Sequence, residues 1–303
     1  MEGSGKRDDI AANQMHNQGL NNKKFPFYVL SEESWQEGVA HEEAPQKIVK
    51  ETNRKIYRHE RQNRFLLKKS EDYDVFDDVF DTPTIMVINS MINDGLIQSF
   101  KSHFASGKES KIYFAIRNDG TPVAVKIYLT VSAEFRKRLR YIAGDPAFNS
   151  IKKGSRSMMA AWAKKEFRNL RAAYQNKVRV PAPIDVRKNV LVMEFIGDKE
   201  GNAYPTLVNS DVSAEDYKQI IDQVTRLYQR AELVHADLSE YNIMKSDDGI
   251  MLFDFGSAVN INHPNAKQFL LRDILNINRF FEKRGVTVLD AGLIIDKIRS
   301  EKI

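Results

Sequence analysis

The strongest constraint on the fold of this chain is a lysine in the middle of an apolar strand. The run VAVKIY, residues 123–128, consists of core-forming residues apart from Lys126 at its centre. Burying an unpaired ammonium is costly, so an anion should meet it. Glu166 is the matching oddity, an acid within the apolar stripe of the helix expected over residues 155–177. We predict that the two side chains pair, with the alternative that both reach solvent.

The first half of the chain is predicted to contain one short helix followed mainly by short strands. Thr82 as N-cap, Pro83 as first helical residue and Gly95 at the end predict a short helix. The runs 111–118 and 123–129, joined at Asp119 and Gly120, are typical of a β-hairpin. A second hairpin is expected within 183–197.

Helices dominate the second half. The stretch 213–233 begins at a Ser213 cap with Asp216 three positions on, the spacing of a capping box. Further helices are expected within 263–284 and 288–301. The predicted fold class is therefore α+β, with two lobes and no internal repeat.

Composition narrows the functional classes. The chain has 303 residues, 42% of them apolar, which suffices for a two-lobed core. It has no apolar run near the ~18 residues that cross a bilayer and no apolar stretch behind its N-terminal charges. We therefore expect a soluble, cytoplasmic protein. The absence of cysteine excludes disulfides, thiolate zinc sites and cysteine nucleophiles.

The charge is unevenly distributed. The net charge of +5 is modest, but basic residues gather in 47–69 and again in 134–156. Each cluster is either a solvated surface or a phosphate-binding surface. Residues 1–45 are polar and without periodicity, which is typical of a mobile tail.

Two further segments carry the residues of a phosphoryl-transfer site. LVHADLSEYNIM, residues 233–244, has the spacing HxDxxxxN, although its residue types also suit an ordinary turn. Asp237 could accept a proton from an attacking hydroxyl or water, and Asn242 could supply an oxygen ligand. Asp254, in IMLFDFGSA, is a second hard ligand suited to Mg²⁺. Protein kinases use a strand lysine held by a helix glutamate to bind ATP phosphates, so this order of motifs favours the active-site interpretation.

With these motifs, the chain resembles the RIO family of atypical serine/threonine kinases, in particular its first subfamily. The resemblance covers roughly residues 75–285 and is carried by SGKESKIYFA, VAVKIY, WAKKEFRNL, PAPIDVRKNVLVMEFIG, LVHADLSEYNIM, FDFGSAV and HPNAKQFLLRDILNINRFF. A single glycine, Gly107, stands where ordinary kinases have G-x-G-x-x-G, and no A-P-E motif follows Asp254. The resemblance implies a trimmed protein-kinase-like fold, with a β-rich N-lobe and a helical C-lobe, that lacks an activation segment and a peptide-docking platform.

The resemblance also implies roles for individual residues. Asp237 would be the proton acceptor, and Asn242 and Asp254 the Mg²⁺ ligands. Asp254 would also accept the γ-phosphate of ATP in an aspartyl-phosphate intermediate. The expected ATP-binding residues are Ser106, Gly107, Lys108, Ser110, Lys126, Glu166, Met193, Glu194 and Ile196.

Three further residues have alternatives. Glu134 is a rival for the role of Glu166, but its surroundings are mostly charged. His235 is expected to be a structural hydrogen-bonding residue rather than a base. Asp273, an acid in an apolar helix, either anchors the catalytic loop or forms an exposed salt bridge.

The expected organisation is a tail over 1–70, a helical segment over 71–100, an N-lobe over 101–196 with a mobile basic insertion near 130–156, and a C-lobe over 197–303. The expected function is an ATP- and Mg²⁺-dependent kinase or ATPase in maturation of the small ribosomal subunit, with precursor rRNA facing the basic clusters and no membrane partner. One alternative is a small-molecule phosphotransferase of the same fold. The other is a ribosome-assembly binding factor switched by ATP with little turnover.

Overall fold

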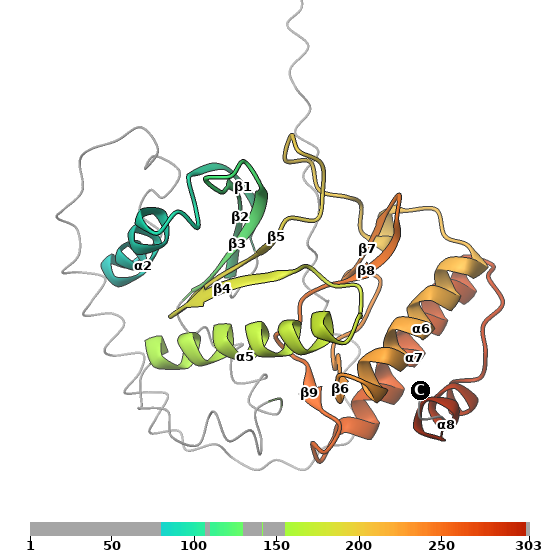
Figure 1. Ribbon diagram of the computed structural model, residues 1–303. Coiled ribbons are helices and arrows are strands. Elements are labelled where there is room, and N and C mark those ends of the chain that lie inside the picture. Colours follow the sequence, from blue (N-terminus) through green and yellow to red (C-terminus); the bar gives the residue numbers. More distant parts are fainter. Residues whose placement is uncertain (1–79, 107–109, 130–140, 142–154, 301–303) are drawn as a thin grey trace, which may run out of the picture.

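The computed structural model describes residues 80–106, 110–129, 141 and 155–300. Within these residues, a lobe built on one β-sheet is followed by a lobe built mainly of helices (Figure 1). The predicted α+β, two-lobed fold class is confirmed.

The N-terminal lobe is built on a five-stranded antiparallel sheet in the order β1-β2-β3-β5-β4. Its strands are β1 (Ser99–Ser106), β2 (Ser110–Ile116), β3 (Pro122–Tyr128), β4 (Pro183–Arg187) and β5 (Val190–Glu194). Both predicted hairpins are present, and Gly120 has the positive φ that the turn between β2 and β3 requires. Strand β1 precedes the first strand expected from the sequence, 111–118. It is an edge strand, and its pairing with β2 has two irregularities in register. A polar sequence can form such an edge strand.

The two faces of the sheet have different neighbours. Alternate residues such as Tyr113, Val125 and Val192 pack with Ile88 and Met91 of α2 (Thr82–Asn93) in one apolar cluster. The residues between them on the strands, including Lys126, belong to the opposite face. The lysine therefore faces away from α2 and toward the rest of the molecule.

Helix α2 starts one residue earlier than predicted. Its N-cap is Asp81, not Thr82, and the Asp81 carboxylate accepts hydrogen bonds from the Thr84 N–H (3.1 Å) and hydroxyl (2.6 Å). Both residue types can cap a helix, and the carboxylate can accept both bonds at once. Gly95, with φ 74°, follows the C-cap residue, as expected for a helix end.

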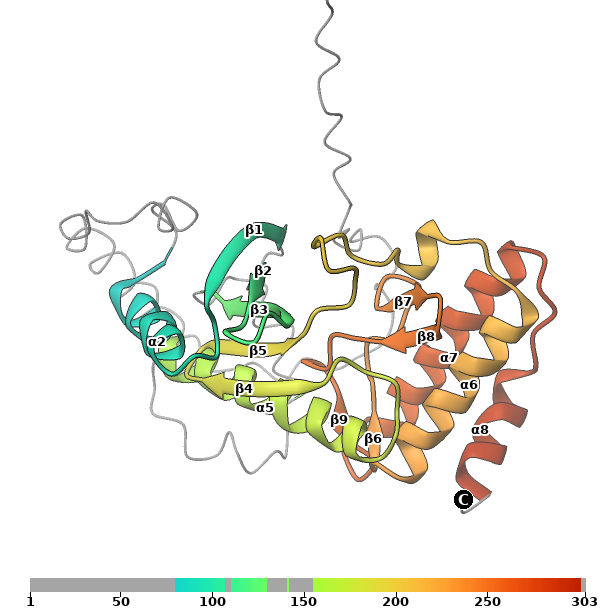
Figure 2. The same ribbon diagram turned by 45° about the horizontal axis from the view of Figure 1, so that its top comes forward.

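Helix α5 (Ser155–Gln175) runs along the sheet below β4 and extends toward the C-terminal lobe, as both views show (Figures 1 and 2). Its predicted apolar stripe is buried at Trp162, Leu170 and Ala173. Glu166, in the middle of this stripe, is only 1% exposed. The helix thus presents an acid from a buried face.

The C-terminal lobe contains α6 (Ala214–Gln229), α7 (Ala266–Lys283) and α8 (Ala291–Ser300), and α6 begins with the predicted capping box of Ser213 and Asp216. Two small antiparallel pairs, β6 (Leu233–Val234) with β9 (Val259–Asn260) and β7 (Ile243–Ser246) with β8 (Gly249–Leu252), were not predicted as separate sheets. A short 3-10 helix, η4 (Leu207–Asn209), precedes α6. One large core joins these helices to α5, so the two lobes share their packing.

Candidate active site

The predicted pair of Lys126 and Glu166 is present and buried. Lys126 Nζ lies 2.8 Å from Glu166 Oε1, with side-chain exposures of 7% and 2%. The same ammonium lies 2.9 Å from Asp254 Oδ1, which is one-third exposed. One strand, one helix and the segment after β8 therefore meet at a single cation.

Glu166 has a second partner that the sequence interpretation missed. The Tyr128 hydroxyl donates a hydrogen bond to Glu166 Oε2. Tyr128 stands two residues after Lys126 on β3, so both side chains project from the same face. This spacing of two residues is the sequence signal from which a contact between Tyr128 and the Lys126–Glu166 pair could have been predicted.

Burial and charge oppose each other at this cluster. Burial raises the pKa of Glu166 to about 7, although Lys126 acts to lower it. Burial acts to lower the pKa of Lys126, but the carboxylates of Asp254 and Glu166 outweigh it and leave the pKa raised. Lys126 is therefore a permanent cation, as a phosphate-binding lysine should be.

The predicted catalytic loop connects β6 to β7. Hydrogen bonds join residues within the loop and join the loop to the segment that precedes Asp254. Asn242 Nδ2 donates to the Asp237 carbonyl (2.7 Å), while the Phe253 N–H donates to the Asn242 carbonyl (3.1 Å). Because Ile243 pairs with Leu252, the loop ends beside the residue that precedes Asp254. Asp237, Asn242 and Asp254 thus lie in two segments that are hydrogen-bonded to each other.

Asp273 anchors this loop from α7. Its carboxylate accepts hydrogen bonds from the N–H groups of Ala236 (2.7 Å) and Leu238 (3.1 Å), and Asp273 is 1% exposed. These bonds support Ala236 at φ 63°, a conformation unfavourable for a non-glycine residue. Of the two alternatives for Asp273, the structure has the loop anchor and not the exposed salt bridge.

His235 is buried and bound to backbone, as expected for a structural residue. Its Nε2 lies 3.0 Å from the Phe253 carbonyl, and its ring packs edge-on against Phe255 with centroids 4.9 Å apart. Burial lowers the pKa of His235 to about 4. The imidazole is therefore neutral at physiological pH and links the catalytic loop to the segment that carries Asp254.

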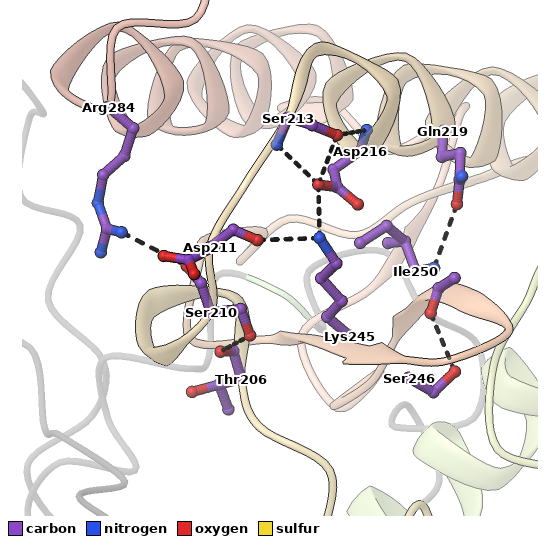
Figure 3. Close-up of polar contacts among 11 residues, drawn as sticks. Thr206, Ser210, Asp211, Ser213, Asp216, Gln219, Lys245, Ser246, Ile250 and Arg284 are labelled. Carbon is purple, nitrogen blue, oxygen red and sulfur yellow. Dashed lines mark hydrogen bonds and ion pairs between the residues drawn. The ribbon is translucent and has the colours of Figure 1, made fainter.

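The strand that follows Asn242 is fixed to α6 (Figure 3). Lys245 Nζ lies 2.8 Å from Asp216 Oδ2 and 2.9 Å from the Asp211 carbonyl. Asp216 also closes the capping box with Ser213, so the N-terminus of α6 and strand β7 hold each other. This arrangement limits the movement of the loop that ends at Asn242.

The expected nucleotide side of the site has an apolar lining. Phe114 and Phe195, with centroids 4.7 Å apart, pack with Ala124 and Met193. Met193 pairs with Ala124 in the sheet, directly beside the strand that carries Lys126. This position is consistent with the predicted role of Met193 beside an adenine base.

Two of the expected ATP-binding residues lie at the end of β5, since Glu194 is its last residue and Ile196 follows two positions later. The Ile196 carbonyl accepts a hydrogen bond from the Tyr204 N–H (3.1 Å), and the Glu194 carboxylate accepts one from the Ala182 N–H (2.9 Å). Ser110 opens β2 and is half-buried. Gly107 and Lys108 lie outside the described residues, and for Ser106 only the backbone is described, so their roles stay predictions.

The residues expected to hold Mg²⁺ are chemically suited to it. Because Asn242 Nδ2 donates to the Asp237 carbonyl, its Oδ1 is the amide atom available as a ligand. Asp254 adds a partly exposed carboxylate. Among the described residues, no three His, Asp or Glu side chains gather into a metal site. Two protein oxygens with open remaining positions suit a cation that keeps water and phosphate ligands.

Several predictions fall on residues that the structure does not describe. The tail over 1–45, the basic cluster over 47–69 and Glu134 lie outside the described residues, as does most of the cluster over 134–156. Arg156 is described, and it forms an ion pair with Asp81 at 2.6 Å. This member of the second basic cluster therefore has a partner within the chain.

The sequence analysis also did not identify two buried polar residues of α5. Lys165 and Asn169, 2% and 5% exposed, bind backbone carbonyls in the segment 255–258. Their spacing of four residues places them on one helix face, but the sequence does not reveal which backbone they meet.

The fold and the buried pair of Lys126 and Glu166, with the partly exposed Asp254 beside it, define a protein-kinase-like chain. Comparison with known families narrows this class, because residues 111–293 match the RIO domain family model. The chain belongs to the RIO family. The predicted resemblance is thereby confirmed.

Named relatives agree with the family model. The chain is 39% identical over 225 residues to the RIO-type serine/threonine-protein kinase Rio1 of Haloferax volcanii, covering 73% of this chain and 77% of that protein. It is 35% identical to the serine/threonine-protein kinases RIO1 of Homo sapiens and Saccharomyces cerevisiae, covering 81% and 75% of this chain but 44% and 53% of theirs. It thus spans about half the length of these two eukaryotic relatives. The predicted class, an enzyme with kinase activity, is confirmed by these relatives.

Solved structures support the fold. A Rio2 kinase of Chaetomium thermophilum, described as an ADP/Mg²⁺-phosphoaspartate complex, aligns with a TM-score of 0.55 at 20% identity, over 82% of this chain and 76% of that one. A second structure of that kinase aligns with a TM-score of 0.56 at 23% identity, over 71% of this chain and 68% of that one. The protein-kinase-like architecture predicted from the sequence is confirmed at this level. None of the described helices is long and apolar enough to span a membrane.

Proposed function

We propose that this chain is an ATP- and Mg²⁺-dependent atypical serine/threonine kinase and ATPase that acts, in the cytoplasm, in maturation of the small ribosomal subunit. The single observation that carries the phosphoryl-transfer part is the contact of Lys126 with both Glu166 and Asp254, at 2.8 Å and 2.9 Å. A buried cation fixed beside a partly exposed carboxylate is suited to bind and orient the phosphates of ATP.

Each residue of the site has a proposed task. Lys126 binds the phosphates and Glu166 holds it in place. Asp254 and the Asn242 amide oxygen are the protein ligands for Mg²⁺, which when bound would neutralise charge on the phosphates. Met193 and the backbone of Glu194 and Ile196 contact the adenine. For Lys126 and Met193, this assignment follows their positions on neighbouring strands, on the face of the sheet opposite α2.

The ATPase reaction proceeds in two steps. A carboxylate oxygen of Asp254 forms a bond to the γ-phosphorus while the bond from that phosphorus to the β,γ-bridging oxygen breaks, and ADP leaves. Water then attacks the phosphorus of the acyl phosphate, Asp237 accepts the proton of the water, and phosphate leaves with Asp254 restored as a carboxylate. The Rio2 kinase structure described as a phosphoaspartate complex supports this scheme by analogy. Protein serine or threonine is the alternative acceptor, with Asp237 accepting the hydroxyl proton.

The acceptor is decided by incubation with γ-labelled ATP, followed by mass mapping. We expect acid-stable label on serine or threonine for the kinase reaction and base-labile label on Asp254 for the ATPase cycle. Asp254→Asn should abolish label at that position, whereas the exposed Asp247→Asn control should not. Nucleotide binding without label or ADP formation would contradict the proposal and favour an ATP-switched binding factor.

The ribosomal part of the proposal depends on the basic clusters 47–69 and 134–156 and on the family. If they bind rRNA phosphates, affinity for small-subunit precursor RNA should fall steeply between about 50 and 200 mM salt. Replacing the lysines and arginines of 47–69 with glutamine should reduce that slope. A slope that is unchanged in this variant would remove the cluster from the RNA interface.

A further inference from the structure

Helix α5 carries two polar side chains that bind the backbone immediately after Asp254. Lys165 and Asn169 are four residues apart and so share a helix face. Their hydrogen bonds run from Lys165 Nζ to the carbonyls of Gly256 (2.8 Å) and Ala258 (2.5 Å), and from Asn169 Nδ2 to those of Phe255 (3.2 Å) and Ala258 (2.9 Å). We call these two side chains the α5 anchor.

The burial of Lys165 indicates that the anchor has a specific task. Lys165 is 2% exposed, with its ammonium 5.3 Å from the centroid of the Trp162 ring. The preceding residue on the helix, Lys164, is exposed. An ammonium is costly to bury, and an apolar residue would fill the space without that cost. The carbonyls of 255–258 are what the buried ammonium binds.

The segment that the anchor binds follows a strained residue. Asp254 has φ 63°, in the left-handed region that residues other than glycine adopt uncommonly. Such a conformation persists only when the surroundings hold it. On the N-terminal side, Phe253 is bound through its carbonyl to His235 and through its N–H to Asn242. On the C-terminal side, the α5 anchor supplies the bonds.

The same helix also reaches the Asp254 side chain. Glu166, adjacent to Lys165, binds Lys126, and Lys126 binds Asp254 Oδ1. One helix thus contacts the backbone after Asp254 directly and reaches the Asp254 carboxylate through Lys126.

We infer that Lys165 and Asn169 are positioning residues that hold Asp254 in the orientation needed to bind Mg²⁺ and accept phosphate. This inference rests on the proposed function of Asp254. Residues that hydrogen-bond to a metal ligand typically change metal affinity or activity by about 10- to 100-fold when they are lost. We expect an effect of this order from the α5 anchor, because it holds the backbone directly after Asp254.

The first experiment needs no ligand. Hydrogen–deuterium exchange is measured on the full chain for Lys165→Met and Asn169→Leu, with Lys164→Met as control because it removes the same charge from the exposed side of α5. We expect the amides of residues 255–259 to exchange at least about tenfold faster in the two anchor variants and unchanged in the control. Equal exchange in wild type and both anchor variants would overturn the inference. If Lys165→Met does not fold, Asn169→Leu alone decides.

The second experiment separates positioning from general stability. The Mg²⁺ concentration for half-maximal ATP turnover is compared with the affinity for ADP without Mg²⁺. We expect the first to rise about 10- to 100-fold in the anchor variants and the second to stay unchanged. Faster exchange with an unchanged Mg²⁺ requirement would reduce the anchor to a structural contact and overturn the positioning role. If wild type shows no Mg²⁺-dependent turnover at all, the proposed function itself fails, while the exchange result still shows whether the anchor holds the segment.

Discussion

Lys126 Nζ and Glu166 Oε1 lie 2.8 Å apart in a place that water hardly reaches. The Tyr128 hydroxyl and the Asp254 carboxylate complete the surroundings of the pair. Because burial already raises the pKa of Glu166 to about 7, its charge depends on the lysine. The pair should therefore respond to pH in a characteristic way when the lysine is removed.

The first prediction concerns the pH dependence of stability in Lys126→Met. Loss of the cation raises the pKa of Glu166 further. In the unfolded chain the Glu166 carboxyl has its ordinary pKa of about 4.5, so above that pH the folded protein keeps a proton that the unfolded chain has released. A raised folded pKa gives stability that is present at low pH and lost as pH rises through that pKa. We expect the free energy of unfolding of Lys126→Met to fall by on the order of 3 kcal/mol between pH 5 and pH 8.

Urea denaturation at each pH measures this effect. The control is Lys126→Met combined with Glu166→Gln. This double variant has no carboxyl at position 166, so its unfolding free energy should depend much less on pH. A Lys126→Met variant with the same slope as this double variant would mean that Glu166 is not the titrating group.

The second prediction concerns Asp237 as the proton acceptor. Asp237→Asn should lower the rate of ATP turnover on the order of 10² to 10⁴-fold, because the amide cannot take the proton of the attacking water or hydroxyl. Affinity for Mg²⁺-ADP should change little. Glu240→Gln, an acid of the same loop, is the matched control and should retain near wild-type turnover. A rate for Asp237→Asn within a factor of a few of wild type would remove Asp237 from the mechanism.

The third prediction concerns the loop anchor Asp273. Asp273→Asn retains one acceptor oxygen where the carboxylate has two, so either the Ala236 or the Leu238 N–H loses its partner. A buried donor without a partner costs about 1 to 3 kcal/mol, which should appear as reduced unfolding free energy in urea. Turnover should also fall, because Ala236 adjoins Asp237. Asp296→Asn, in the exposed part of α8, should change neither quantity.

Sequence patterns were sufficient for much of the fold because the relevant physics is local. The hairpin turn at Gly120 and the capping box at Ser213 each depend on neighbouring residues. The cost of burying Lys126 extended the prediction to a partner 40 residues away. At the start of α2 the same local argument placed the N-cap one residue too late, at Thr82 instead of Asp81, because both residue types can cap a helix.

The missed residues depend on tertiary contacts that leave no local pattern. Lys165 and Lys164 are adjacent lysines in the sequence, yet one is buried against backbone carbonyls and the other is exposed. What distinguishes them is that the carbonyls of Gly256 and Ala258 lie within reach of Lys165, and the local sequence does not reveal where that backbone runs. Tyr128 was closer to being predictable, since it shares a strand face with Lys126, but an aromatic residue there also suits a core.

The last prediction concerns His235 and acid. Its Nε2 lies 3.0 Å from the Phe253 carbonyl, so the neutral ring has its proton on Nε2 and donates it. Its Nδ1 is buried and has no hydrogen-bond partner among the described residues. A second proton would therefore sit on a buried nitrogen without a partner, and burial lowers the pKa of His235 to about 4. Because the unfolded chain takes up that proton near pH 6.5, stability present above pH 6.5 is lost as pH falls toward 4.

We expect this histidine to contribute up to about 3 kcal/mol to the loss of unfolding free energy between pH 7 and pH 4. The measurement is urea denaturation of wild type and His235→Asn across this range. At pH 7.5 the variant should be less stable, because it loses the packing of the ring against Phe255. Below pH 6.5 its stability should fall less steeply than that of wild type, so that the difference between the two proteins narrows on acidification. Parallel curves throughout would show that His235 takes up no proton on unfolding, and the acid sensitivity would then have to come from other groups.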